Sequence, residues 1–88
     1  MGYKTKPYNN GKSWHSLGVH TCADDTDTGV QDKYRMFIPD TTGALTVRYA
    51  SGGSTEVITV VAGGVYQIGN IYSFDATGSD STTVGLYA

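Results

Sequence analysis

The side chains best suited to metal chemistry lie close together near the N-terminus. His15, His20 and Cys22 are the only soft ligands in the chain, and zinc prefers such ligands. A structural zinc site needs a fourth ligand, and the sequence has no second Cys or third His. We therefore expect the histidines to have a surface or interface role and Cys22 to pack as a small hydrophobic residue. Because this Cys has no partner for an internal disulfide, we expect assembly in a reducing compartment.

The run from Asp24 to Gly29 is the strongest candidate for calcium. Asp25 and Asp27 alternate with threonines before the glycine, and such carboxylates can place hard oxygen ligands around one ion. An EF-hand loop that began at Asp25 would need an acidic ligand at its twelfth position, which is Met36. We expect no cofactor, and instead a loop whose Asp and Thr side chains cap backbone amides. Calcium stays open as the alternative.

The sequence does not predict an enzyme. It contains Ser, Thr, His and Asp but no nucleophile elbow, phosphate-binding loop or paired-carboxylate motif. The pairs Gly52-Gly53 and Gly63-Gly64 lack the strand-to-helix setting of a nucleotide loop. A chain of 88 residues also has little room for a pocket that excludes water.

The elements that must position these residues are predicted to be short strands. Twelve Gly, seven Tyr and many Thr and Val favour strands with tight turns. Residues 33–38 and 44–49 alternate as half-buried strands do, whereas 56–61 is apolar on both faces, so one face could contact a second sheet or a neighbouring subunit. Further strands are expected near 65–68, 70–74 and 82–87. The predicted fold class is all-β: a small β-sandwich or partial barrel of about six to eight short antiparallel strands with an extended N-terminal arm.

Residues 1–22 are expected to be a docking arm and residues 23–88 a single β-sandwich domain. The arm combines lysines with isolated large aromatics, which commonly anchor interfaces. Two alternatives stay open: a disordered tail, and an edge strand at 13–21 whose Trp14, Leu17 and Val19 face protein. The residues expected to contact a partner are Tyr3, Lys4, Lys6, Tyr8, Lys12 and Trp14.

Composition also limits which kinds of partner we expect. The net charge is −2 and the basic residues form no dense patch, so we expect no nucleic-acid partner. No apolar stretch is long enough for a membrane helix and the first residues lack the apolar centre of a signal peptide, so we expect no membrane partner. A single small core gives only marginal stability. We therefore expect contacts with other protein subunits to add the stability that the core does not supply.

Several short segments resemble, in their order, the head spike base proteins of tailed phages and gene transfer agents. The resemblance covers residues 24–88. The chain departs from the family at 67–72, QIGNIY, where the family has a basic, proline-containing strand. The matching segments are DDTDT at 24–28, YRMFI at 34–38, GALTV at 43–47, AGG at 62–64, ATG at 76–78 and VGLY at 84–87.

The resemblance implies a structural virion protein of a tailed phage. It would be a capsid decoration (cement) protein or a head spike base that binds the outer capsid surface and self-associates as a trimer or pentamer. Its implied partners are the major capsid protein and its own copies, with a fibre protein as a further candidate. It would be made in the host cytoplasm and act on the outer surface of the virion. The alternatives are a tail or baseplate adaptor and a module that recognises host glycans through its tyrosines, with or without calcium.

Overall fold

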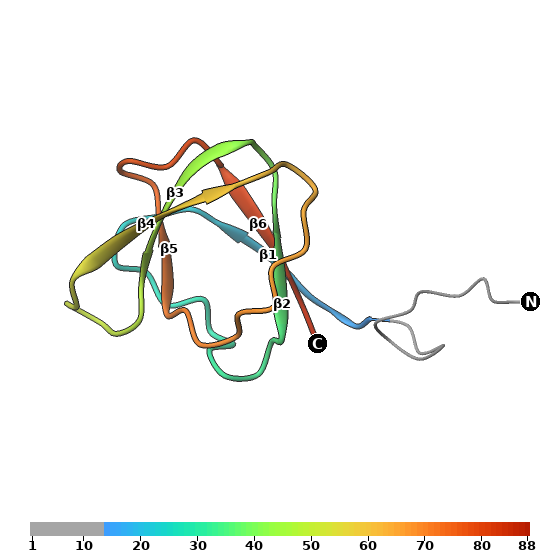
Figure 1. Ribbon diagram of the computed structural model, residues 1–88. Helices are drawn as coiled ribbons and strands as arrows, with labels where there is room; N and C mark the ends of the chain where they lie inside the picture. Colours follow the sequence, from blue (N-terminus) through green and yellow to red (C-terminus); the bar gives the residue numbers. More distant parts are fainter. Residues whose placement is uncertain (1–13) are drawn as a thin grey trace, which may run out of the picture.

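The computed structural model describes residues 14–88, which form two antiparallel sheets packed face to face (Figure 1). The first sheet has the strand order β1-β6-β2 and the second β4-β3-β5. This arrangement confirms the predicted all-β fold and small β-sandwich. No described segment is a helix that could cross a membrane. The strands are β1 (Ser16–Thr21), β2 (Met36–Pro39), β3 (Gly43–Arg48), β4 (Thr55–Val60), β5 (Ser73–Asp75) and β6 (Thr83–Tyr87).

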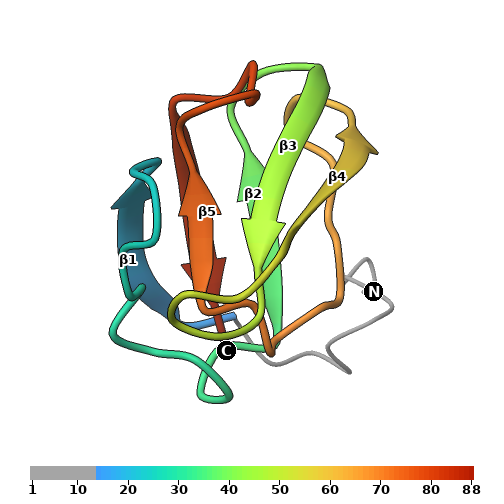
Figure 2. The same ribbon diagram turned by 90° about the vertical axis from the view of Figure 1, so that its left-hand side faces the viewer.

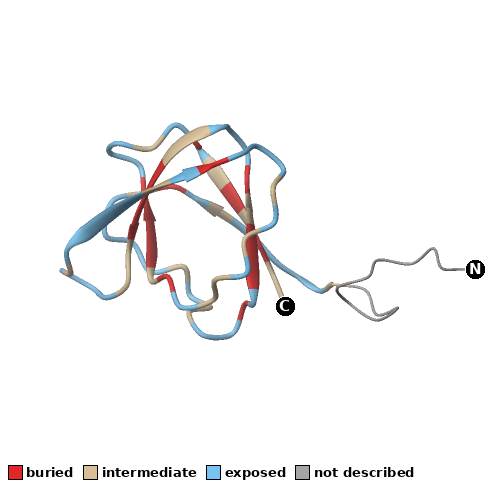
Figure 3. Cartoon of the chain, in the orientation of Figure 1, coloured by how far each residue is buried: buried red, intermediate tan, exposed pale blue. Residues whose placement is uncertain are grey.

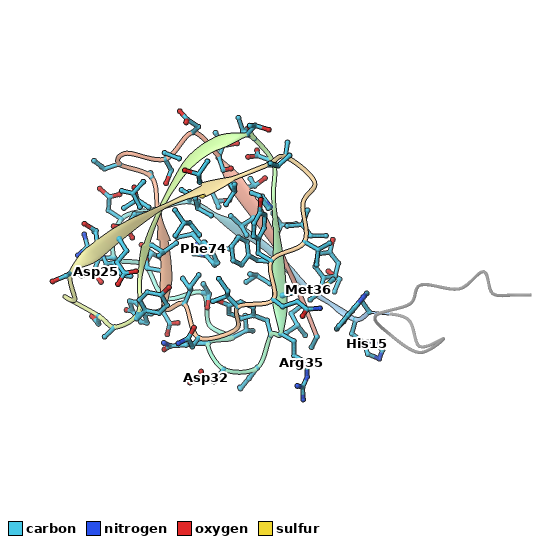
Figure 4. The ribbon with its side chains drawn as sticks, in the orientation of Figure 1. His15, Asp25, Asp32, Arg35, Met36 and Phe74 are labelled. Carbon is cyan, nitrogen blue, oxygen red and sulfur yellow. The ribbon has the colours of Figure 1, made fainter. Side chains whose placement is uncertain are left out.

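An aromatic cluster forms the core between the two sheets. Phe37 and Phe74 meet edge to face with ring centroids 5.1 Å apart, and Tyr66 stacks on Phe37 at 5.3 Å. Such geometries add to the free energy of burial. The buried hydroxyl of Tyr34 donates to the carbonyl of Ile71 and accepts from its amide. This cluster, with Phe74 between the sheets in Figure 4, holds the sandwich together.

The period-2 pattern predicted the core side of β3 correctly. Leu45 and Val47 are fully buried. The pattern is less regular in β2, where the adjacent residues Met36 and Phe37 are both buried and Ile38 is only half-buried. The strand begins only at Met36. A short strand covered on both sides cannot show the alternation that was expected from residue 33 onward.

The strands predicted at 65–68 and 70–74 are not formed as expected. The first is a single bridge between Tyr66 and Phe37, and the second is limited to the three residues of β5. Between them the chain crosses so close to Tyr34 that a side chain on Gly69 would collide with its carbonyl oxygen. This close crossing replaces regular strand pairing.

The N-terminal edge strand that was left open as an alternative is present. β1 pairs with β6 from Ser16 to Thr21, so this segment belongs to the sheet and not to an arm. What remains of the predicted arm, residues 1–13, lies outside the described residues. Leu17 and Val19 were expected to face protein, yet they are 37% and 69% exposed. They lie on the outer face of a two-layer sandwich, which no part of residues 14–88 covers.

A buried carboxylate connects three segments that are distant in sequence. Asp75 is only 1% exposed. It accepts hydrogen bonds from the Ser73 hydroxyl at 2.7 Å, the Asp25 amide at 3.2 Å and the Arg48 Nε at 2.7 Å. Arg48 Nη1 in turn donates to the carbonyl of Gly53 at 2.8 Å. One side chain thus fixes the 22–29 loop, the β3–β4 turn and β5 together.

We predict that Asp75→Ala lowers the free energy of unfolding by about 3 kcal/mol, because it leaves Arg48 without its counter-charge and the Asp25 amide without its acceptor. The matched control is Asp27→Ala, which removes a local bond to the exposed Gly29 amide and should cost less than about 1 kcal/mol. Urea unfolding followed by circular dichroism measures both. Equal losses in the two variants would contradict this role for Asp75.

Candidate interaction surface

Two of the four outer sheet edges are covered by the chain itself. Beside β2, Tyr66 exchanges backbone hydrogen bonds with Phe37 at 2.9 and 3.0 Å. Beside β5, the loop after β1 runs alongside, with the Ala23 amide donating to the carbonyl of Phe74 at 3.0 Å. Both edges therefore have most of their backbone groups satisfied internally.

The other two edges, β1 and β4, lie on opposite sides of the molecule (Figure 2) and have no strand beside them among residues 14–88. The register of β1 shifts between Ser16 and Gly18, and Gly18 has φ of 108°. Such a bulge bends an edge and discourages further pairing. In contrast, β4 pairs with β3 over all six residues without a shift. The edge of β4 is therefore the more regular of the two.

The outer side of β4 and of the residues after it exposes several valines. Ile58 and Val60 point toward the core, whereas Val57 and Val61 are 64% and 58% exposed. Val65, on the following segment, is 40% exposed. Figure 3 shows β4 as mostly exposed beside the buried strands. The prediction that this segment carries apolar residues on both faces is confirmed: Ile58 and Val60 lie on the core, and no part of residues 14–88 covers Val57 and Val61.

The acidic residues mainly close loops. The Asp24 carboxylate accepts from the amides of Ala76 and Thr77 and from the Thr77 hydroxyl at 2.5 to 2.9 Å. These hydrogen bonds, with that of Thr77 strongest, lower the pKa of Asp24. Asp25 accepts instead from the amide of Gly52. The expected amide capping is confirmed, and the two adjacent carboxylates are turned to different loops.

The sulfur and imidazole groups are spread along β1 and its ends. His15 is exposed, His20 is half-buried with its ring 5.8 Å from that of Phe74, and Cys22 is buried. Among residues 14–88 no three His, Cys, Asp or Glu side chains gather in a way that could hold a metal ion. The burial of Cys22 agrees with its predicted packing role.

A shallow depression of about 490 Å³ lies between residues 32–35 and 67–70. Its lining carries charges of both signs, Asp32 beside Lys33 and Arg35, the first and last of which are labelled in Figure 4. It contains no Ser, Thr, Cys or His.

Of the six predicted contact residues, the structure describes only Trp14, which is half-buried just before β1. The other five, Tyr3, Lys4, Lys6, Tyr8 and Lys12, lie outside the described residues. The sequence nevertheless separates charge at this boundary. Residues 1–13 carry three Lys and no acidic residue, which is +3, whereas residues 14–88 carry eight Asp and Glu against three Lys and Arg, which is −5.

The tyrosines of the domain are mostly engaged in packing. Tyr34 is 2% exposed, and Tyr49 and Tyr66 pack partly against the core. Tyr72 and Tyr87 are half-buried. None of these five presents a fully exposed ring for stacking on a sugar.

The edge of β4 was not among the predicted contact residues. A usable signal was present, because Val57, Thr59 and Val61 alternate with Ile58 and Val60 in a strand with a single charge, Glu56. Sequence periodicity could not show that β4 is an outermost strand, since that depends on the sheet order. Comparison with protein families, with curated proteins and with solved structures gives no match for this chain.

We predict that His20 makes the fold weaker in mild acid. Burial lowers the pKa of His20, and its Nε2 has no hydrogen-bond partner among the described residues. The unfolded chain therefore binds this proton at higher pH than the folded one, so stability falls as the pH decreases below about 6.5. His20→Phe should remove the part of the decline between about pH 7 and 5 that comes from this group. Thermal unfolding at several pH values tests this, and an unchanged pH profile in the variant would refute it.

We also predict that Cys22 is unreactive in the folded protein. Burial raises the pKa of the thiol to about 11, so little thiolate exists at neutral pH. An aromatic disulfide reagent should label Cys22 slowly in buffer and rapidly in urea. Labelling at the rate of a free thiol in buffer would show that β1 opens readily.

Proposed function

We propose that this chain is a structural virion protein of a tailed phage that binds the outer capsid surface and self-associates, as a capsid decoration protein or a head spike base. The order of the short segments from 24–28 to 84–87 supports this family, and the small all-β sandwich is compatible with it. Its action would be adhesion, with no chemical step.

The charge division at residue 13 is the observation on which the docking part of the proposal rests. A +3 segment joined to a −5 domain is suited to binding an acidic shell, because the segment is attracted to a surface that repels the rest of the chain. The segment also contains Tyr3 and Tyr8, side chains that commonly anchor interfaces. The basic segment thus would bind capsid protein and leave the domain facing outward.

We predict that removal of residues 1–13 abolishes binding to capsids of the phage that encodes the chain and leaves the fold intact, because β1 begins only at Ser16. Co-sedimentation with purified capsids measures binding, and circular dichroism with thermal unfolding measures the fold. A matched variant, Lys4, Lys6 and Lys12 all changed to Gln, should weaken binding more at low salt than at high salt.

Three outcomes would decide against parts of this proposal. Full binding by the truncated chain would remove the docking role of residues 1–13. Failure of the full chain to bind capsids, together with binding to isolated tails or baseplates, would favour the adaptor. Binding to a glycan array that a chelator abolishes would favour the glycan-recognition module.

A further inference from the structure

The hydrogen-bond pattern around β3 shows which backbone groups of β4 have no partner among residues 14–88. Ala44 exchanges hydrogen bonds with Asp80, its amide donating to the carboxylate and its carbonyl accepting from the amide, both at 2.8 Å. The carbonyl of Arg48 accepts from the amide of Tyr72 at 2.8 Å. These even-numbered residues of β3 therefore direct their backbone groups away from β4, and the odd-numbered ones, such as Leu45, direct theirs toward it.

The register between β3 and β4 then shows which backbone groups of β4 bond to β3. Leu45 is opposite Ile58 and Val47 is opposite Glu56, so the even-numbered residues of β4 bond to β3. Thr55, Val57 and Thr59 point their amides and carbonyls at the open edge.

The bonds just beyond β4 follow the same alternation. The Ala62 amide turns toward the β3 side, where it meets the Thr42 hydroxyl at 2.9 Å. The Val61 amide turns the other way, to the Tyr66 hydroxyl at 2.7 Å. The free edge therefore ends at Thr59.

These three residues are symmetric about Val57. Read in either direction, the outward positions are Thr, Val and Thr. An antiparallel strand with its two-fold axis at Val57 would place the Val57 side chains opposite each other and each Thr55 opposite Thr59 of the other copy. Val–Val and Thr–Thr are favourable cross-strand pairs, and every free amide and carbonyl of the edge would have a partner. A self-complementary strand is what a two-fold interface requires.

We propose that two copies of this chain associate through β4, antiparallel and centred on Val57, to form one continuous six-stranded sheet. The inference specifies a contact for the self-association included in the proposed function, but it does not depend on binding to a capsid. Its two-fold symmetry differs from the trimer or pentamer that the resemblance implies.

The strand also carries a feature that limits this association. Glu56 lies on the inner side of β4 and is exposed. In the proposed register the two Glu56 residues are diagonal neighbours, about 7 to 8 Å apart at the backbone. Their repulsion, and the −5 charge of residues 14–88 in each copy, oppose pairing. The contact is also small beside the roughly 1,200 Å² of a stable interface, so association should be weak and concentration-dependent.

The first test is sedimentation equilibrium of the full chain from about 10 µM to about 1 mM, the range suited to a small contact. We expect a monomer at low concentration and twice the chain mass at high concentration. Val57→Lys should weaken association at least about tenfold, because it puts two ammonium groups at the axis. The matched control is Val19→Lys, the same change at a residue 69% exposed on the other open edge, which should associate like the wild type. Thermal unfolding checks that both variants fold.

Glu56→Gln should strengthen the dimer about threefold and make it less sensitive to salt. Removal of residues 1–13 should leave the dimer in place, since β4 is the contact. Hydrogen exchange gives an independent measurement: the amides of Thr55, Val57 and Thr59 should gain protection as concentration rises, whereas that of Ile58 should not change.

The inference is overturned if the full chain stays monomeric throughout the range, if Val19→Lys weakens association as much as Val57→Lys, or if a trimer or pentamer forms that Val57→Lys leaves unchanged. Loss of the dimer on removal of residues 1–13 would mean that this segment, and not β4 of a second copy, occupies the interface. Capsid binding measured below the association range reports on the proposed function separately.

Discussion

The buried carboxylate of Asp75 fastens the loops of this small sandwich to its sheets. Removing a charge from water is costly unless it is paired and hydrogen-bonded, and here one side chain accepts from Arg48, Ser73 and the Asp25 amide. To donate its amide to Asp75, Asp25 must hold the 22–29 loop against β5. Arg48, which pairs with the same carboxylate, also binds the carbonyl of Gly53 and so holds the β3–β4 turn nearby. Asp75 thus acts together with the bonds of Asp24 to Ala76 and Thr77 to set the position of this loop.

The position of the 22–29 loop decides which sheet edges are available. The loop runs along β5 and forms hydrogen bonds with its outer edge. The crossing of the chain at Gly69 likewise places Tyr66 against the outer edge of β2. The edge of β1 is broken by its bulge at Gly18. The regular edge of β4 is left, so the interaction surface is a consequence of how the rest of the described chain covers the other edges.

Rules based on neighbouring residues predicted correctly those features that depend on neighbouring residues. Alternation located Leu45 and Val47 in the core, and the preference of Asp and Thr for capping predicted the role of Asp24. They did not predict that the strand near 65–68 would be missing. Its absence goes with the close approach of Gly69 to Tyr34, and these two residues are far apart in the sequence. They indicated that one face of 56–61 could contact a second sheet or a neighbour, but not that β4 is an edge strand, because the period of a pattern does not show which strand is outermost. The part of the predicted contact site at residues 1–13 stays a prediction.

Glu56 and the acidic domain give the open edge a further property. An exposed, regular strand invites uncontrolled pairing, and natural edges are commonly protected by charge. Here a single inward charge and a shared negative field would keep dilute copies apart without blocking the strand. If copies are held side by side on a shell, their effective concentration rises, and a contact too weak to form in dilute solution becomes occupied. The same weak edge would therefore pair mainly where the subunits are already gathered.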